Sequence, residues 1–254
     1  MAPPPLAARE AVREQQFSDV WNNDLNDAFA DIAPYYDRGN DIAALGLWGT
    51  FLKKFMRTVD LKPNQRVLDV CAGTNAIGIA LLKREPTLDV HAMDRSAAMQ
   101  QVGQQRALAQ GLHIKSTIGD VHKLPFPDNH FDIVTLQFAS RHLRVREVFT
   151  EILRVLKPGG HFHHSDMLRP RNPVVKTLYY TYLKMCLNFT SLMVKSGPSA
   201  VKCKQYFLDA LELFYTAEEL TVVLQELGFV EVTSVTVFSG MLGFHRAVKP
   251  QPAA

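Results

Sequence analysis

The stretch Arg66-Val67-Leu68-Asp69-Val70-Cys71-Ala72-Gly73-Thr74-Asn75-Ala76-Ile77-Gly78-Ile79-Ala80 decides how this chain is organised. An apolar, β-branched run ends in a carboxylate and a small-residue turn, and apolar residues then return at helical spacing. This pattern predicts a strand, a tight loop and a helix. In an open α/β sheet such a loop lines the ligand crevice, and a residue as small as Gly73 lets the backbone approach a ligand. Alone, the loop fits many nucleotide enzymes and also plain α/β domains.

Acidic residues recur where the following strands end. The stretch 88–94 is a second strand that ends in Asp94, about twenty residues on, where such folds place a carboxylate on ribose hydroxyls. A helix is predicted over 100–110, a third strand over 113–118 before Asp120, and a fourth strand over 131–138. Because parallel strands end at one edge of a sheet, we expect Asp69, Asp94 and Asp120 in one crevice. Taken singly, each acid is as easily a helix cap or a solvated turn residue.

Sequence motifs add a specific resemblance. The segments LDVCAGT, AMD, GDVHKLPFPDNHFDIVT and EILRVLKPGG, with a KPGG turn over 157–160, resemble class I S-adenosylmethionine (SAM) methyltransferases. Within that superfamily the chain resembles the C-methyltransferases of ubiquinone and menaquinone biosynthesis. This second resemblance is carried by FADIAPYYDRGND, the pair Arg141-His142, DMLRPRNPVVKTLYYTY, YFLDALELFYTAEEL and SGMLGFHRAVK.

The resemblance implies an α/β, Rossmann-like fold. Its seven-stranded mixed sheet is flanked by helices, its last strand is antiparallel, and a helical insert caps the substrate. The expected organisation is a tail and lid helix over 1–28, a methyltransferase domain over 29–249 with a substrate cap over 173–215, and a disordered tail over 250–254. The last two strands, 229–238 and 241–248, alternate as a hairpin.

SAM is the implied cofactor, and the resemblance assigns its contacts. Gly73 and Thr74 meet the methionyl part with Asp69 near the ammonium group, Asp94 chelates the ribose hydroxyls, and Asp120 accepts the adenine amino group. The same site includes Arg95, Val121 packed on the ring, and Gln137, which either faces the sulfonium or makes a structural hydrogen bond. Asn75 replaces the usual glycine; asparagine tolerates a positive φ, although its side chain adds bulk facing the donor.

Three residues are candidates for catalysis. Tyr36 aligns with a family tyrosine that contacts donor or substrate, although a packed tyrosine corner explains it equally without the resemblance. Arg141 aligns with the family residue that activates the substrate, and it stabilises a phenolate or holds a water. His142 replaces an asparagine; it titrates near neutrality and takes the proton directly, or it donates one hydrogen bond as asparagine would.

A metal site is not expected. His161, His163, His164 and Asp166 gather near the fifth strand, but His164 points away from the other two histidines because side chains alternate along a strand. Methyl transfer from a sulfonium also needs no metal for its leaving group. Asp166 matches a family acid and is expected to orient the Arg141 region.

The flanking segments bear on partners. A polar amphipathic helix is predicted over 10–29 with Phe17, Val20, Trp21 and Leu25, after a disordered start over 1–8. The apolar segment 173–195 contains lysines and is too interrupted for a membrane span. It suits a wall for a polyprenyl tail, a membrane-surface or dimer contact, or ordinary core.

Composition sets the outer limits. The 254 residues suit one α/β domain, and a net charge of +3 suits an anionic membrane surface without calling for nucleic acid. Three cysteines without metal-ligand spacing favour a reduced cytosol, with mitochondrial import left open. The sequence therefore predicts a SAM-dependent methyltransferase that C-methylates a prenylated benzoquinol or naphthoquinol. The alternatives are an O- or N-methyltransferase of another hydrophobic small molecule, and a non-catalytic SAM-binding subunit of a quinone-synthesis complex.

Overall fold

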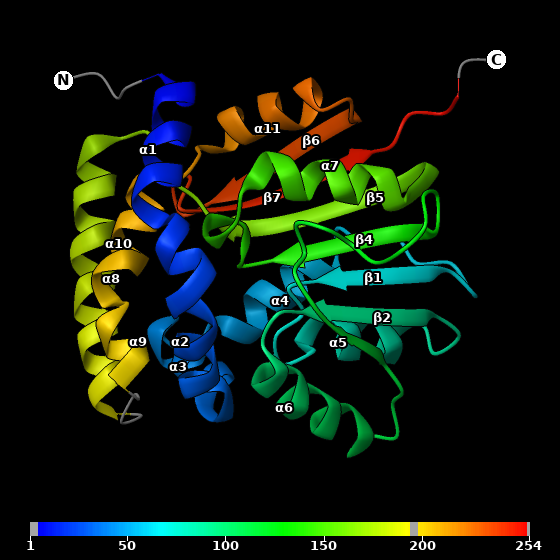
Figure 1. The fold of residues 1–254 in the computed structure, drawn as a ribbon, viewed down its shortest axis with the longest axis horizontal. Helices are drawn as coiled ribbons and strands as arrows, with labels where there is room; N and C mark the ends of the chain where they lie inside the picture. Colours follow the sequence, from blue (N-terminus) through cyan, green and yellow to red (C-terminus); the bar gives the residue numbers. More distant parts are fainter. Residues whose placement is uncertain (1–4, 194–197, 253–254) are drawn as a thin grey trace.

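A seven-stranded mixed sheet forms the centre of the computed structural model, which describes residues 5–193 and 198–252 (Figure 1). The strands are β1 (Arg66–Val70), β2 (Asp89–Asp94), β3 (Lys115–Ile118), β4 (Phe131–Gln137), β5 (Leu156–Met167), β6 (Val230–Val237) and β7 (Leu242–Val248). Their order is β3-β2-β1-β4-β5-β7-β6. The first five strands pair in parallel, while β7 runs antiparallel to both β5 and β6. This confirms the predicted fold class.

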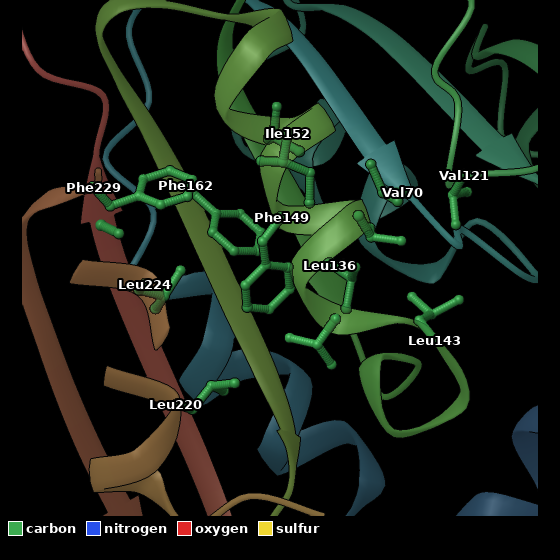
Figure 2. Packing of buried hydrophobic residues seen from close by; sticks show 14 of the residues in the cluster. Val70, Val121, Leu136, Leu143, Phe149, Ile152, Phe162, Leu220, Leu224 and Phe229 are labelled. Carbon is green, nitrogen blue, oxygen red and sulfur yellow. The ribbon is translucent and has the colours of Figure 1, made fainter. Parts of the chain in front are cut away.

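Two hydrophobic clusters cover the two faces of the sheet. Helices α7 (Val145–Val155) and α11 (Ala217–Glu226) pack on one face, where Phe149 and Phe162 lie between Leu136 and Phe229 (Figure 2). Helices α4 (Trp48–Met56), α5 (Ala76–Arg84) and α6 (Ala97–Leu108) contribute to the cluster on the other face. Neighbouring strand residues divide between the faces, with Val67 in one cluster and Leu68 in the other, because side chains alternate along a strand.

A second layer lies beyond the carboxyl ends of the parallel strands (Figure 1). Its N-terminal part comprises α1 (Leu6–Asp19), the π-helical turn η1 (Val20–Asp24), α2 (Leu25–Ile32), the 3₁₀ turn η2 (Ala33–Tyr35) and α3 (Tyr36–Ala43). Its cap comprises α8 (Pro173–Met193), α9 (Pro198–Lys202) and α10 (Lys204–Glu212). A third cluster joins the two parts, with Phe17, Trp21 and Leu25 packed against Tyr206 and Ala210.

Several predicted boundaries differ from the structure. Helix α1 already begins at Leu6, so the predicted disorder over 1–8 is wrong for its helical part, and its first four residues lie outside the described chain. The KPGG segment belongs to β5 rather than to a turn before it. It forms a bulge, because the pairing with β4 jumps from Phe131–Leu156 to Ile133–His161.

Two further findings concern the C-terminal tail and the length of the apolar helices. The predicted tail starts without regular secondary structure over 250–252, and residues 253–254 lie outside the described part. Across residues 5–193 and 198–252, no helix is both long and apolar enough to cross a membrane.

Candidate active site

The loop after β1 is shaped by positive backbone angles. Gly73 has φ +50°, and its N–H donates to Asp94 Oδ2 over 2.8 Å, which ties the end of β1 to the end of β2. Asn75 also adopts a left-handed conformation, with φ 57°, as its residue type predicts. Its side chain, however, turns toward α6, where Oδ1 accepts from Gln100 Nε2 over 2.9 Å. The prediction that Asn75 adds bulk facing the donor is therefore wrong, and Gly103 makes room for it, because a Cβ there would lie 2.8 Å from the Asn75 amide.

A pocket of about 110 Å³ opens above the ends of β1, β2 and β4. Its lining includes predicted donor-binding residues from each strand end: Gly73, Asp94, Arg95, Asp120, Val121 and Gln137. The Asp94 carboxylate accepts hydrogen bonds from the N–H groups of Gly73 and Ser96, both 2.8 Å away. Burial raises the pKa of Asp94. We call this cavity the donor pocket.

Asp120 is oriented by a neighbouring histidine. The His122 ring Nδ1 lies 2.5 Å from Asp120 Oδ1, and His122 Nε2 accepts from the N–H of Arg144 over 3.1 Å. These contacts fix the His122 proton on Nδ1, from which it is donated to Asp120. Burial raises the pKa of Asp120, but hydrogen bonds from the His122 backbone and ring outweigh this effect, so the pKa is lowered overall. Asp120 is therefore an ionised hydrogen-bond acceptor at the edge of the donor pocket.

Asp69 lines a smaller cavity of about 40 Å³, which shares Gly73 and Gln137 with the donor pocket. Asp69 Oδ1 accepts from Thr135 Oγ1 over 2.7 Å, whereas Oδ2 is buried without a partner in the part of the chain that the structure describes. Burial raises the pKa of Asp69 to about 7, against the hydrogen bond from Thr135, which lowers it. Gln137 Nε2 is likewise buried and unpaired among the described residues. A cationic and polar ligand group would satisfy both atoms.

Two predicted donor residues make protein contacts of their own. Thr74 donates from Oγ1 to Asp37 over 3.1 Å, and Asp37 also pairs with Arg106, so α3 is fastened to the β1 loop. Arg95 donates to the carbonyl oxygens of Trp21 and Asn22 over 2.5 and 2.6 Å. Its guanidinium therefore holds η1 over the donor pocket.

A larger, mostly apolar cavity of about 210 Å³ lies under the cap. Side chains from α2, α3, α8 and α10 line it, among them Phe29, Ile32, Tyr36, Leu183, Leu187, Phe207 and Leu211. Phe29 and Tyr36 also line the donor pocket, and their rings meet edge to face with centroids 6.3 Å apart. Among the residues that the structure describes, these two side chains alone belong to both linings. We call this second cavity the acceptor cavity.

Arg141 lines the acceptor cavity with its side chain 15% exposed. Its Nη1 lies 2.5 Å from Asp166 Oδ1 and donates to the Phe138 carbonyl oxygen over 2.9 Å. Asp166 is fully buried and also accepts from Ser140 Oγ over 2.6 Å, so the predicted orienting contact is present. Burial lowers the pKa of Arg141, but the neighbouring Asp166 carboxylate outweighs this effect, so the pKa is raised overall. Arg141 remains charged while a substrate reacts beside it.

His142 lines the donor pocket, whereas Arg141 lines the acceptor cavity. Its Nδ1 lies 2.8 Å from the Tyr206 hydroxyl, and its ring packs against Phe29 and Phe207. Burial, together with the charges of Arg141 and Arg13, lowers the pKa of His142 well below its usual value. These features keep the imidazole neutral and make it a weak base, which argues against His142 as the residue that takes the substrate proton.

The β5 histidines divide between the two faces of the strand as predicted. His161 and His163 lie together with ring centroids 6.1 Å apart, while His164 packs against His245 on the other side. His164 Nε2 contacts Ser140 Oγ at 2.7 Å. Within residues 5–193 and 198–252, no group of three or more His, Cys, Asp or Glu could hold a metal ion.

Comparison with known proteins places this site in a family. The model of the ubiE/COQ5 methyltransferase family matches residues 16–249. The chain belongs to this family. It is 32% identical over 228 residues to the ubiquinone/menaquinone biosynthesis C-methyltransferase UbiE of Pseudomonas fluorescens, covering 88% of each chain. It is 31% identical over 234 residues to the demethylmenaquinone methyltransferase of Lactobacillus johnsonii, covering 91% of this chain and 94% of the relative.

A solved structure supports the fold. Phosphoethanolamine N-methyltransferase 2 of Haemonchus contortus, in complex with S-adenosylhomocysteine, superimposes with a TM-score of 0.62 at 18% identity, covering 81% of this chain and 53% of that one. With its family membership, the chain is a SAM-dependent methyltransferase.

Sequence reasoning missed two contacts that shape the site. Asp37 follows the Tyr36 of interest, but its bonds to Thr74 and Arg106 join segments far apart in sequence. Arg13, to which the sequence analysis assigned no role, is 3% exposed. The regular spacing of Arg9 and Arg13, four residues apart on one helical face, is the only signal that pointed to an inward role.

Proposed function

We propose that this enzyme transfers the methyl group of SAM to a ring carbon of a prenylated benzoquinol or naphthoquinol. The observation that carries the proposal is the contact between the two cavities. Phe29 and Tyr36 lie between a donor pocket that contains Asp94 and Asp120 and an apolar cavity that contains Arg141. The names of the bacterial relatives support a quinone-biosynthesis acceptor for such a cavity.

The donor pocket and the smaller cavity beside it together suit SAM, because they share Gly73 and Gln137 and contain unpaired polar atoms. The unpaired Asp69 Oδ2 would receive the ammonium group, and Gln137 would donate from Nε2 to the carboxylate of the methionyl part or turn its amide oxygen toward the sulfonium. Asp94 would accept from the ribose hydroxyls, and Asp120 from the adenine amino group with Val121 on the ring. Gly73 leaves space for close approach, because a Cβ there would lie 3.2 Å from Met99 Cε. Bound SAM supplies an electrophilic methyl group on a positively charged sulfur.

Arg141 would activate the acceptor. A hydroxyl beside this guanidinium loses its proton more readily, since the positive charge stabilises the phenolate. The phenolate concentrates electron density on the neighbouring ring carbon, which forms the new C–C bond as the methyl–sulfur bond breaks. The ring carbon then loses its proton and the phenolate oxygen regains one, so the net products are the methylated quinol, S-adenosylhomocysteine and one proton. Tyr36, whose pKa burial raises, would meet the reacting ring as a neutral phenol.

The outer face of α8 supports a lipid surface as the source of the acceptor. Val174, Leu178, Met185 and Phe189 are each more than half exposed and recur along one face of this helix. The opposite face lines the acceptor cavity through Leu183 and Leu187. Between residues 167 and 208 there is no Asp or Glu, against six basic residues besides the buried Arg169, which pairs with Glu219: Arg171, Lys176, Lys184, Lys195, Lys202 and Lys204. Such a combination is typical of helices that lie on anionic membranes.

Vesicle flotation tests this contact. The full chain should float with vesicles of anionic phospholipid and less with zwitterionic ones, and Met185→Glu with Phe189→Glu should abolish flotation while turnover of a short-tailed quinol persists. A matched control is Val235→Glu, at an exposed apolar position on β6. If the chain instead forms a dimer that the α8 substitutions dissociate, a second copy covers this face and the membrane contact is rejected.

A turnover assay tests the reaction itself. Purified protein with methyl-labelled SAM and a reduced, demethylated prenyl naphthoquinol or benzoquinol should release S-adenosylhomocysteine and a product labelled on a ring carbon. Labelling on oxygen or nitrogen, or only with other acceptors, would reject C-methylation of a quinol. SAM binding without turnover of either quinol would favour a non-catalytic subunit.

A further inference from the structure

A buried arginine of the N-terminal helix holds the backbone around His142. Arg13 Nη2 donates to the carbonyl oxygens of Arg141 and Leu143 over 3.1 and 3.3 Å. Its guanidinium also lies over the rings of Trp21, Phe214 and Tyr215, with 5.1 to 5.7 Å to their centroids. No carboxylate forms an ion pair with it among the described residues, so carbonyl oxygens and aromatic faces stabilise the charge. Helix α1 is thus joined to the chain on both sides of His142, next to the turn η3 (Ser140–His142).

A second connection reaches the His142 ring. Trp21 Nε1 donates to the Tyr206 hydroxyl over 2.9 Å, and that hydroxyl lies 2.8 Å from His142 Nδ1. The indole nitrogen is only a donor, so it occupies the acceptor side of the phenol oxygen. The phenol proton then has His142 Nδ1 as its acceptor. His142 Nδ1 is therefore unprotonated, and the proton of the neutral ring resides on Nε2.

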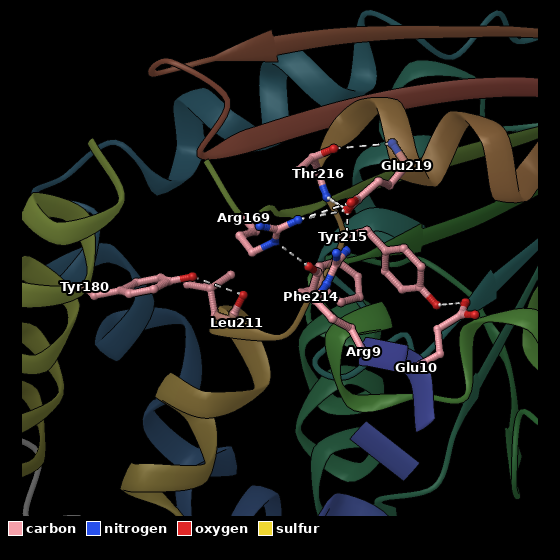
Figure 3. Close-up of polar contacts among 9 residues, drawn as sticks. All are labelled: Arg9, Glu10, Arg169, Tyr180, Leu211, Phe214, Tyr215, Thr216 and Glu219. Carbon is pink, nitrogen blue, oxygen red and sulfur yellow. Dashed lines mark hydrogen bonds and ion pairs between the residues drawn. The ribbon is translucent and has the colours of Figure 1, made fainter. Parts of the chain in front are cut away.

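Helix α1 is itself fixed to the body of the enzyme. Figure 3 shows Arg9 beside Glu219, at a distance of 2.5 Å, and the Tyr215 hydroxyl donating to Glu10 over 2.5 Å. Glu219 also pairs with Arg169 and closes the capping box of α11 through Thr216. Arg9 and Glu10 lie about one helical turn from Arg13, so these contacts let α1 hold the turn η3 at a fixed position.

We infer that Arg13 and Tyr206 are positioning residues for methyl transfer: they hold the turn that carries Arg141 and keep His142 as a neutral ring with its proton on Nε2. This inference rests on the proposed function, because the turn acts on the acceptor through Arg141. Nε2 is buried and unpaired among the described residues, on a side chain that lines the donor pocket. His142 therefore serves the site as a hydrogen-bond donor, and Nδ1 is closed to an incoming proton by Tyr206.

Imidazole NMR and kinetics test the inference together. In full-length protein labelled with ¹⁵N-histidine, with the His142 signals assigned from their loss in His142→Asn, Nδ1 should be unprotonated and Nε2 protonated. In Tyr206→Phe the His142 tautomers should mix. We expect kcat to fall about ten- to a hundredfold in Tyr206→Phe and Arg13→Met, as misplaced catalytic groups do, with the Kd of SAM within about twofold. Arg13→Lys, which keeps a donor, should recover part of the loss.

Glu14→Gln is the matched control, since Glu14 lies on the same helix and pairs with Arg144 at the surface. It should leave kcat within about twofold. The inference is overturned if Nδ1 is protonated in the wild type, or if kcat is unchanged in Tyr206→Phe and Arg13→Met. It is also overturned if kcat, SAM affinity and Tm all fall together in these variants, because that pattern indicates a general loss of structure. If the wild type turns over no quinol, the proposed function fails, and the tautomer of His142 in wild type and Tyr206→Phe still decides whether the Trp21–Tyr206 connection sets its proton.

Discussion

Asp69 should make SAM binding depend on pH near neutrality. Its carboxyl group is 1% exposed, one oxygen is unpaired among the described residues, and burial raises its pKa to about 7. Pairing with the ammonium group of SAM requires the ionised form. With a pKa of about 7, the ionised fraction is about three-quarters at pH ~7.5 and about 3% at pH ~5.5, so affinity should fall roughly twentyfold between them.

Calorimetry in two buffers of different ionisation enthalpy measures this linkage. Near pH ~6, binding of SAM to the wild type should release close to one proton. Asp69→Asn keeps an oxygen for Thr135 to donate to, and it should bind SAM more weakly, with an affinity that depends less on pH. Any dependence of SAM affinity on pH that remains in Asp69→Asn would come from Asp94, because burial also raises the pKa of Asp94. Wild-type affinity that changes less than twofold over this range, or a full slope in Asp69→Asn, would refute the reasoning.

The same pKa shift acts on stability without ligand. A carboxyl whose pKa is raised in the folded state stabilises the fold below its unfolded pKa of about 4, and this contribution is lost as the pH rises through about 7. Urea unfolding of the SAM-free enzyme should therefore give a free energy of unfolding that Asp69→Asn raises, relative to wild type, more at pH ~7.5 than at pH ~5.

Three substitutions test other parts of the structure. Arg141→Gln should lower kcat at least about a hundredfold while the Kd of SAM stays within twofold, because the phenolate loses its cation; loss of SAM binding would contradict this role. His142→Asn should leave the shape of the pH–rate profile unchanged, since one neutral hydrogen-bond donor replaces another. If the acidic limb of the profile disappears in this variant, His142 acts as the base. Phe149→Ala should reduce the free energy of unfolding by about 3–5 kcal/mol in urea titration, because this ring is fully buried in the cluster of Figure 2.

The sheet and the acid positions could be predicted because local patterns determine them. The alternation of Val67 and Leu68 places them in opposite clusters, and strand ends bring Asp94 and Asp120 to one pocket. Contacts between distant segments could not be predicted in this way. Trp21 and Tyr206 are separated by 185 residues, and no periodicity links them. Burial of Arg13 likewise depends on the rings of Trp21 in η1 and of Phe214 and Tyr215 in the loop before α11, whereas composition alone places an arginine in solvent.

The KPGG segment shows a different limit. Gly and Pro indicate a break in regular structure, which the sequence interpretation placed as a turn outside the strand. In the structure the break is a bulge inside β5, where Gly159 has φ 75° and a Cβ on Gly160 would lie 2.8 Å from the Lys157 carbonyl oxygen. Whether a local break ends a strand or bends it depends on the partner strand, and β4 continues to pair on both sides of this bulge.

Two departures from the usual family residues, Asn75 and His142, raised the alternative of a non-catalytic subunit, and their surroundings argue against it. Asn75 occupies its left-handed position and turns into the space beside Gly103, so it takes no room from the donor pocket. His142 satisfies its added nitrogen with Tyr206 and retains an N–H as asparagine would. Each unusual side chain has a matched partner on a neighbouring helix. The site also keeps the charged Arg141 beside an apolar cavity by pairing it with the fully buried Asp166. Burying such a pair is costly, and a subunit that only binds SAM has no need of it. The structure thus favours an enzyme that accommodates both residues.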